Sequence, residues 1–505
     1  MHLSFVCIVL NHKMRKKSAI VIGAGFSGLS AASHLAKEGY AVRVLEKNDI
    51  PGGRARKLEE QGFTFDMGPS WYWMPDVFDR FFESFGKKTA DFYQLERLDP
   101  SYRIVWGKND HTDLPADFNS FLEMFESLEP GSAAKLEAFL KEAEFKYRVG
   151  INKLVYKKSA SPLEFIDPEL MTGVFKLHVF KSFHDYVRKY FKNPKLIQML
   201  EFPVLFLGGT PKTTPALYSL MNYGDIKLGT WYPQGGMYKV VEGMVDLAKS
   251  LGVEFEYGTP VHKLDIQNRE IKQVLLNSHG YTADVVVASA DYHHVEQSLL
   301  PDGYRQYTDN YWENRVMSPS SLIFYLGINK PVGKLKHHTL FFDEDFSKHA
   351  DEIYNDPKWP ERPSIYLSNT SKTDNSVAPE GMENIMVLIP VAPDLNDNED
   401  VREKYFDYVI EKLENYTGES IRDNIVYKRS YAHRDFANDY NAFKGNAYGL
   451  ANTLMQTAFL KPKLQSKKVK NLFYAGQLTV PGPGVPPAII SGEVAAREIV
   501  KQFKN

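Results

Sequence analysis

Apolar and polar residues near the N-terminus follow the order of a strand, a helix and a second strand. AIVIG at 19–23 is short, apolar and β-branched, which is typical of a buried parallel strand. Residues 27–39 then carry apolar side chains at helical spacing and end at a glycine. AVRVLE at 41–46 indicates the second strand. The pattern predicts two parallel strands joined by a helix over 19–46.

The C-terminal region shows a strand and a helix with an unusual loop between them. NLFYAG at 471–476 is typical of a buried strand, and residues 488–503 have apolar side chains at helical spacing. The loop TVPGPGVPP separates them. Proline fixes φ, lacks an N–H and suits the first turn of a helix, as at Pro487. We predict that this stiff loop presents the positive end of the helix without a side chain in the way.

The turn after the first strand has the spacing of a dinucleotide site, G-x-G-x-x-G. The first glycine allows the tight turn, the second lets the backbone approach a pyrophosphate, and the third lets the helix pack on the strand. Glu46 ends the second strand, near the position of an acid that accepts ribose hydroxyls, which favours FAD or NAD over NADP. The alternative is a glycine-rich structural turn. The candidate contacts are Gly23, Gly25, Phe26, Ser27, Gly28, Glu46 and Lys47.

Composition narrows the classes of function. The 505 residues indicate two or three domains, and a net charge of -2 gives no general attraction to nucleic acid. Cys7 is the only cysteine, which excludes an intramolecular disulfide and a cysteine metal cluster and fits a reducing cytoplasm. The 14 histidines form no metal-spaced cluster, and we expect His293–His294 and His337–His338 to be surface or hinge residues. We therefore predict no metal site.

The pattern of apolar residues also bears on membranes. No apolar run reaches the roughly 18 residues needed to span a bilayer. Residues 1–13 are interpreted as a loose tail or an upstream start ahead of Met14. Aromatic and basic residues recur at helical spacing over 174–192, which predicts either a helix lying in a membrane interface or a surface helix packed on the core. The many aromatic residues indicate either a large core or a cavity for an apolar ligand.

Further motifs resemble a known family. Gly52-Gly53-Arg54 soon after Glu46 resembles the extension found in amine oxidases and carotenoid desaturases, and GFTFDMGPSWYWMP resembles their strand toward the flavin ring. PGPGVPPAIISG is similar to the signature of bacterial-type phytoene desaturases. The resemblance covers about 14–90 and 200–500 and implies FAD as the cofactor. It adds as candidate contacts Gly52, Gly53, Arg54, Gly68, Pro69, Val261, Gly476, Gly484, Val485 and Pro486.

The resemblance also implies the fold: an α/β protein with a Rossmann-type, glutathione-reductase-like FAD-binding domain. This domain is expected to be discontinuous, assembled from 14–100, 225–300 and 440–505. Residues 101–224 and 301–439 are expected to form a mixed α+β substrate region with a helical part that contacts the membrane. Within it, the polar, proline-containing stretch 356–381 is interpreted as a loop.

The activity that the resemblance implies is desaturation of a linear carotenoid, with phytoene to lycopene as the first expectation. The flavin takes a hydride, and oxygen or a quinone then takes the electrons. A lipophilic substrate implies peripheral association with the cytoplasmic membrane. The alternatives are a hydroxycarotenoid or C30 carotenoid desaturase, a carotenoid isomerase, an amine oxidase and a non-enzymatic scaffold. Asp167 is a weak acid/base candidate whose simpler interpretation is a helix N-terminal acid, and no catalytic triad is evident.

Overall fold

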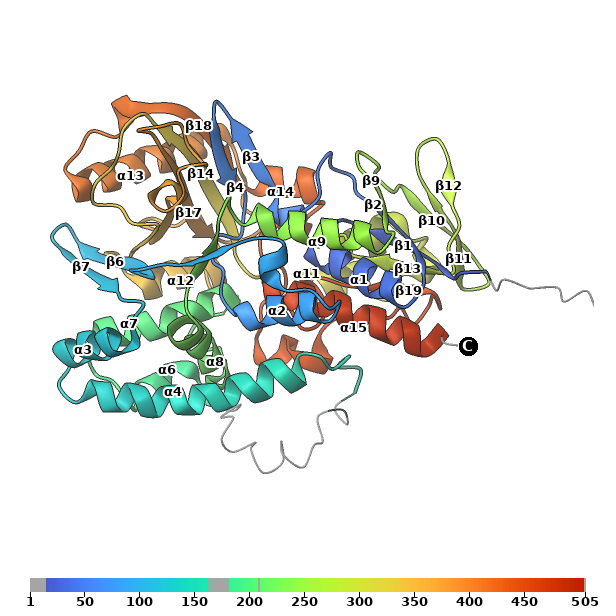
Figure 1. Ribbon diagram of the computed structural model, residues 1–505, viewed down its shortest axis with the longest axis horizontal. Coiled ribbons are helices and arrows are strands. Elements are labelled where there is room, and N and C mark those ends of the chain that lie inside the picture. Colours follow the sequence, from blue (N-terminus) through green and yellow to red (C-terminus); the bar gives the residue numbers. More distant parts are fainter. Residues whose placement is uncertain (1–14, 162–163, 165–180, 208, 504–505) are drawn as a thin grey trace, which may run out of the picture.

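A five-stranded parallel sheet brings together the three predicted parts of the nucleotide-binding half. We describe the chain from a computed structural model over residues 15–161, 164, 181–207 and 209–503. The sheet has the order β19-β13-β1-β2-β9 and lies on the right in Figure 1. Its strands are β1 (Ser18–Ile22), β2 (Ala41–Leu45), β9 (Glu254–Glu256), β13 (Val285–Ala288) and β19 (Leu472–Tyr474). Strands from distant parts of the chain therefore lie side by side in one sheet.

A seven-stranded, mostly antiparallel sheet forms the other half, at the upper left of Figure 1. In spatial order its strands are β18 (Ile425–Tyr431), β14 (Ser320–Ile328), β17 (Glu383–Val391), β16 (Ile365–Ser368), β15 (His338–Phe341), β6 (Tyr102–Gly107) and β7 (Asp110–Leu114). A three-stranded sheet consists of β10 (Lys263–Gln267), β11 (Glu270–Leu275) and β12 (Gly280–Tyr281). Two further sheets have two strands each: β3 (Lys57–Glu60) pairs with β4 (Phe63–Asp66), and β5 (Leu95–Arg97) pairs with β8 (Trp231–Pro233).

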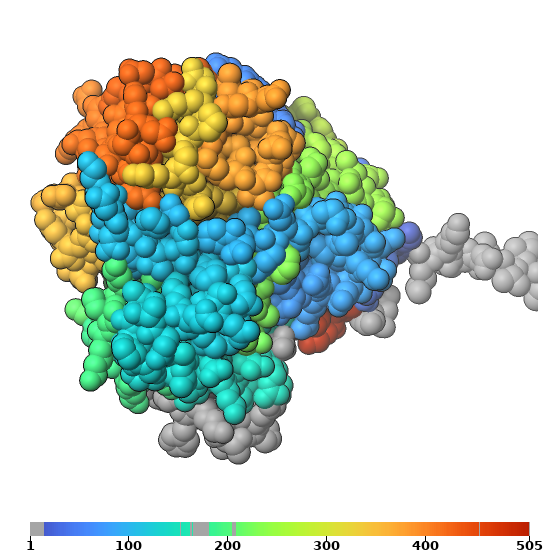
Figure 2. Space-filling view, turned by 60° about the vertical axis from the view of Figure 1, so that its left-hand side comes forward, coloured from blue at the N-terminus to red at the C-terminus, as the bar shows by residue number. Residues whose placement is uncertain are grey.

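Helices surround both sheets. Those of the nucleotide-binding half are α1 (Phe26–Lys37), α2 (Pro75–Glu83), α9 (Tyr238–Ser250), α10 (Tyr292–His294) and α15 (Val485–Phe503). The others are α3 (Phe118–Leu128), α4 (Ser132–Val149), α6 (Phe183–Val187), α7 (Pro194–Glu201), α8 (Leu220–Asn222), α11 (Asp309–Glu313), α12 (Phe346–Tyr354), α13 (Glu399–Thr417) and α14 (His433–Tyr440). In Figure 2 the half that carries α13 lies above the teal helices α3 and α4.

Glycines let α1 lie close to the turn after β1 and let α15 lie close to α1. A Cβ at Gly28 would lie 2.0 Å from the Gly23 oxygen, and one at Gly492 would lie 2.2 Å from the Ser27 oxygen. Ser30 also donates a hydrogen bond to the Ile489 oxygen at 2.7 Å. The predicted strand–helix–strand unit and the C-terminal strand and helix are confirmed. The two ends of the chain thus form one packed layer.

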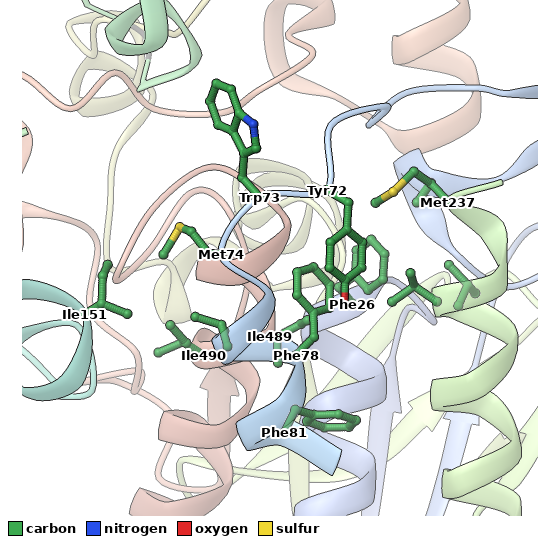
Figure 3. Packing of buried hydrophobic residues seen from close by; sticks show 14 of the residues in the cluster. Phe26, Tyr72, Trp73, Met74, Phe78, Phe81, Ile151, Met237, Ile489 and Ile490 are labelled. Carbon is green, nitrogen blue, oxygen red and sulfur yellow. The ribbon is translucent and has the colours of Figure 1, made fainter. Parts of the chain in front are cut away.

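The main core runs through both halves. Figure 3 shows Phe26 of α1, Phe78 and Phe81 of α2 and Ile489 of α15 in one cluster of buried side chains. A second cluster lies between the seven-stranded sheet and α13, where β14 contributes Leu322, Phe324, Leu326 and Ile328. Because side chains alternate along a strand, β14 is left with its other face, including Ser321 and Ile323, for the interior of the molecule.

Two expectations about secondary structure are wrong in the described residues. The helix predicted over 174–192 is present only as α6, which ends at Val187, and residues 174–180 lie outside the described residues. Phe183, Val187 and Phe191 are buried in the main core, so the described part of this apolar face packs inside the protein. The stretch 356–381, interpreted as a loop, contains the buried central strand β16. Residues 1–13 and Asp167 lie outside the described residues.

Candidate functional site

One cavity of about 460 Å³ extends between the two large sheets. Glycine-rich turns and the starts of α1 and α15 line one part of it. The seven-stranded sheet and α12 line the other part with mainly apolar side chains. Both predicted parts of the chain therefore contribute to a single site.

The turn after β1 leaves room for a ligand beside the backbone. Gly23 has a φ of +102°, which favours glycine, and its N–H donates to the Leu45 oxygen at 2.8 Å. A Cβ at Gly25 would have only the Gly53 Cα nearby, at 4.0 Å, so a side chain there would project into the cavity. Helix α1 starts at Phe26 with no side chain capping it. Its first N–H groups form a site suited to a phosphate.

Glu46 is buried and fixes the turn that lines the cavity. Its carboxylate accepts hydrogen bonds from the Ala24 N–H at 2.7 Å and the Asn48 N–H at 2.9 Å. A carboxylate oxygen can accept more than one bond, so a ribose hydroxyl remains compatible with this geometry. Lys47 beside it donates to the Asn438 oxygen at 2.6 Å. Glu46 therefore orders the backbone as well as lining the cavity.

Arg54 crosses the middle of the cavity wall. Its side chain is half-buried, and burial lowers the pKa of its guanidinium while nearby Asp291 opposes that effect. Arg54 donates to the Asn446 oxygen at 3.2 Å, but its Nε has no partner within the described residues. A half-buried cation whose Nε donor is buried and unused is suited to an anionic or oxygen-rich ligand. A Cβ at neighbouring Gly68 would lie 2.3 Å from the Arg54 oxygen, so only glycine fits there.

The start of α15 faces the same cavity. Gly484 has a φ of +108°, and Val485, Pro486 and Pro487 follow as the first residues of the helix. All four line the cavity. The two prolines have no N–H, so Val485 supplies the donor of this helical turn while the helix dipole supplies partial positive charge. This arrangement agrees with the predicted role of the loop.

The opposite wall is aromatic. Trp71 stacks on His338 with ring centroids 4.1 Å apart, and Tyr366 bonds the Ser70 hydroxyl and His338 Nδ1, each at 2.8 Å. His337 and His338 are buried, so their expected surface or hinge position is wrong. Burial lowers the pKa of both imidazoles. Both are neutral, and His338 contacts the lining side chains of Trp71 and Tyr366 without lining the cavity itself.

A few polar atoms on this wall are not paired. Ser364 Oγ and Tyr354 Oη are buried and have no hydrogen-bond partner within the described residues. Both residues line the cavity. His349 of α12 lies beside Ser364 and is already used: it pairs with the Pro390 oxygen at 2.8 Å and accepts from the Ser364 N–H at 3.2 Å. An unpaired buried hydroxyl costs about 1–3 kcal/mol, so a partner from a ligand would stabilise this wall.

The structure brings nearly all the predicted site residues to this cavity. Gly28 is the exception, because it packs helix on strand, as its position in the motif predicts. His294 also lines the cavity, and His293 is half-buried beside it. The lining predicted residues are Gly23, Gly25, Phe26, Ser27, Glu46, Lys47, Gly52, Gly53, Arg54, Gly68, Pro69, Val261, Gly476, Gly484, Val485 and Pro486.

Sequence reasoning missed most of the opposite wall. Ser364 and Tyr366 lie in the stretch interpreted as a loop, and Tyr354 and His349 belong to no motif. The run of aromatic residues around Trp71 was the available signal. No group of three or more His, Cys, Asp or Glu side chains suited to a metal ion occurs in the parts of the chain that the structure describes.

Comparisons with known proteins agree with this geometry. The family model for flavin containing amine oxidoreductases matches residues 26–500, and the chain belongs to this family of flavoenzymes. Within it the chain belongs with the bacterial-type carotenoid desaturases. It is 44% identical to the carotenoid 3,4-desaturase of Haloarcula japonica, over 96% of this chain and 98% of that protein.

More distant relatives show the same fold. The chain is 31% identical to the zeta-carotene-forming phytoene desaturase of Myxococcus xanthus, over 95% of this chain and 93% of that protein. An oxidoreductase structure from Methanosarcina mazei superimposes with a TM-score of 0.62 at 16% identity, covering 96% of this chain and all of that one. The protein is an FAD-dependent oxidoreductase with an amine-oxidase-like fold.

The residues present fit FAD. The open space at Gly25, the unpaired Nε of Arg54 and two helix starts facing one groove provide sites for a pyrophosphate and a flavin ring. No helix within the described residues combines the length and apolar character needed to cross a bilayer.

Proposed function

We propose that this protein is an FAD-dependent carotenoid desaturase. The observation that carries the proposal is the single cavity that joins a dinucleotide-type groove to a large apolar wall. The wall, formed by residues such as Trp71, Leu340, Phe342 and Ile353, is suited to a long hydrocarbon chain. The Haloarcula and Myxococcus relatives are named for carotenoid desaturation, which supports this assignment.

Along the groove, different predicted residues would bind different parts of FAD. Gly23, Gly25 and Gly53 with the start of α1 would hold the pyrophosphate, Glu46 would receive the ribose, and the start of α15 would face the flavin ring. When bound, FAD accepts the hydride that leaves the substrate. The corresponding domain division is 14–100, 225–300 and 440–505 for the cofactor and 101–224 and 301–439 for the substrate.

The chain's own contribution to the reaction is positioning and exclusion of water. The wall of the seven-stranded sheet and α12 carries no carboxylate or ammonium group among its lining residues. Such a wall would hold an apolar polyene in a fixed orientation and would give an ammonium substrate no counter-charge. This favours a carotenoid over an amine.

Purified holoenzyme tests the proposal directly. Phytoene and lycopene would be supplied separately in liposomes, with and without oxygen or a quinone, and the products identified by absorbance and mass spectrometry. A product lighter by two hydrogen atoms per step, with longer-wavelength absorbance, is the expected result. Unchanged mass with altered geometry would instead indicate an isomerase. Failure with every C40 and C30 polyene, with FAD bound, would contradict the proposal.

A second candidate is a desaturase of an oxygenated carotenoid. The unpaired buried hydroxyls of Ser364 and Tyr354 favour it, because a pure hydrocarbon would leave both without partners. A hydroxylated acyclic carotene should then be preferred over the matching hydrocarbon, and Ser364→Ala with Tyr354→Phe should reduce that preference about 10-fold or more. A loss of FAD in this variant would show that the hydroxyls serve the cofactor.

A further inference from the structure

One small surface reverses the usual order of exposed and buried residues. Four large apolar side chains are exposed in the part of the chain that the structure describes, and three of them, Val316, Met455 and Leu460, belong to adjoining segments. Val316 donates to and accepts from the Gln456 side chain at 2.9 and 2.8 Å. We call these three residues the 316/455/460 patch.

Two neighbouring pairs make the reversal plain. Met455 is 74% exposed while Gln456 is 4% exposed, and Leu460 is 38% exposed while Lys461 is 2% exposed. Water favours the opposite arrangement, since apolar side chains gain from burial and a lysine is rarely buried. The loop therefore turns its apolar side chains outward in a way that water alone does not explain.

The segments that carry this patch connect to cavity-lining residues at three points. Val316 is three residues before Pro319, which lines the cavity. Leu460 is two residues before Pro462, whose oxygen accepts a 2.6 Å bond from cavity-lining Thr479.

The third point joins the loop to the short 3-10 helix Ala216–Ser219, which directly precedes α8. Thr457, between Met455 and Leu460, lies 3.5 Å from the Tyr218 hydroxyl through its own Oγ1. Tyr218 precedes Met221 of α8, which lines the cavity. The patch is therefore linked through its own segments to residues that line the cavity.

Several lysines lie near the patch, and one of them, Lys158, pairs with Glu498 at 3.7 Å. Lys463 reaches the Ser159 and Ala160 oxygens at 3.4 and 3.5 Å, which brings the segment with Lys157 and Lys158 beside the loop. Glu164 in this region is used by the backbone N–H groups of residues 159–161. Apolar side chains beside lysines are complementary to a bilayer with anionic headgroups.

We infer that the 316/455/460 patch is where the protein docks on an anionic lipid surface to take up its substrate. The inference rests on the proposed function, because a water-insoluble carotenoid must be withdrawn from lipid. It also replaces the α6 segment as the contact, since the apolar face of that helix is buried in the core. Met455 and Leu460 would enter the headgroup region, and the lysines would meet the phosphates.

Liposome flotation of the full-length holoenzyme tests this. Vesicles of phosphatidylcholine with phosphatidylglycerol would be mixed with the parent, with Met455→Glu/Leu460→Glu, and with Val426→Glu. Val426 is the fourth exposed apolar residue, 44% exposed on edge strand β18, and serves as the matched control. The double variant should lose roughly 10-fold or more of its lipid-bound fraction, because two charges replace two inserted apolar groups. The Val426→Glu variant should float like the parent.

Activity separates docking from catalysis. The double variant should desaturate liposomal substrate about 10-fold more slowly but detergent-solubilised substrate at the parent rate, with unchanged FAD content. Equal flotation of all three proteins would overturn the inference, as would an equal loss in Val426→Glu. A halved molar mass for the double variant in solution would assign the patch to contact between two copies and would also overturn it. A parent that is inactive even in detergent would refute the proposed function instead.

Discussion

The two walls of the cavity are built on different principles. On the nucleotide side, the wall depends on closely packed backbone atoms. At Gly28, Gly68 and Gly492 a single added Cβ would lie within 2.3 Å of a carbonyl oxygen. On the opposite side, side chains such as Trp71 and Phe342 supply shape and apolar area. Positions of the first kind tolerate one residue type, whereas positions of the second kind can exchange one apolar residue for another of similar volume.

This difference predicts the effect of a substitution in each wall. A substitution on the nucleotide side should remove the cofactor or the fold, because the backbone cannot move away from its neighbours. A substitution on the apolar side should leave FAD bound and change only how substrate is held. Four predictions test this contrast, from the largest expected effect to the smallest.

Gly28→Ala should have the largest effect. Its Cβ would lie 2.0 Å from the Gly23 oxygen, so α1 must move away from the turn after β1. We expect a destabilisation of about 3 kcal/mol or more and loss of bound FAD. Thermal unfolding followed by fluorescence, together with FAD content after purification, measures both. Gly303→Ala is the control, because a Cβ there meets nothing within 4 Å. A stable Gly28→Ala protein with bound FAD would contradict the claim that the two walls differ in their tolerance of substitution.

Glu46→Ala should come next. Removing the carboxylate leaves the Ala24 and Asn48 N–H groups without their acceptor and withdraws the group predicted to receive the ribose. The affinity for FAD should fall by roughly 10- to 100-fold, measured by titrating apoprotein with FAD. Glu46→Gln keeps one acceptor oxygen and should lose less. An unchanged affinity in Glu46→Ala would remove Glu46 from the cofactor site.

Phe342→Ala probes the apolar wall. It would remove a cavity-lining ring that packs against Trp106 and Phe202. We expect kcat/KM for the carotenoid to fall about 10-fold with full FAD content. Phe406→Ala is the matched control. Phe406 of α13 is similarly buried, but it belongs to the hydrophobic cluster between α13 and the seven-stranded sheet and does not line the cavity. Loss of FAD in Phe342→Ala would show that the two walls are not separable.

The same contrast explains how far the sequence could predict the molecule. The glycines of the first turn, Glu46 and the loop before α15 were predictable, because recognition by backbone demands particular residue types at fixed spacing. Strand β16 was not, because its four buried residues lie between prolines and polar residues that are typical of a loop. Ser364 and Tyr366 were missed with it, because a wall that recognises its ligand by shape requires no residue types at fixed spacing in the sequence. The amphipathic pattern around α6 was real, but the pattern does not say whether core or lipid covers the apolar face.

The two ends of β13 give the smallest and most specific prediction. Burial raises the pKa of Asp291, at the cavity end, to about 6, and Arg54 only partly offsets this. At the outer end, burial also acts on Asp284, but hydrogen bonds from Ser18 and Arg15 outweigh it and hold its pKa below the ordinary value.

These shifts have opposite consequences for stability as pH changes. Between about pH 4 and 6 the folded protein binds more protons at Asp291 than the unfolded chain does, so this group's contribution to stability falls as pH rises. Asp284 contributes stability above its unfolded pKa, which is lost as pH falls through its folded pKa. The Tm of the parent relative to Asp291→Asn should therefore fall from pH 4.5 to pH 7 by about 1–2 °C, on the order of 1–2 kcal/mol. The difference for Asp284→Asn should hold or grow over the same interval. The measurement is made on apoprotein. If the Tm difference from the parent changes with pH in the same way for both variants, the cavity end of β13 is as well solvated as its outer end. That result would contradict a site from which water is excluded at the junction of the two walls.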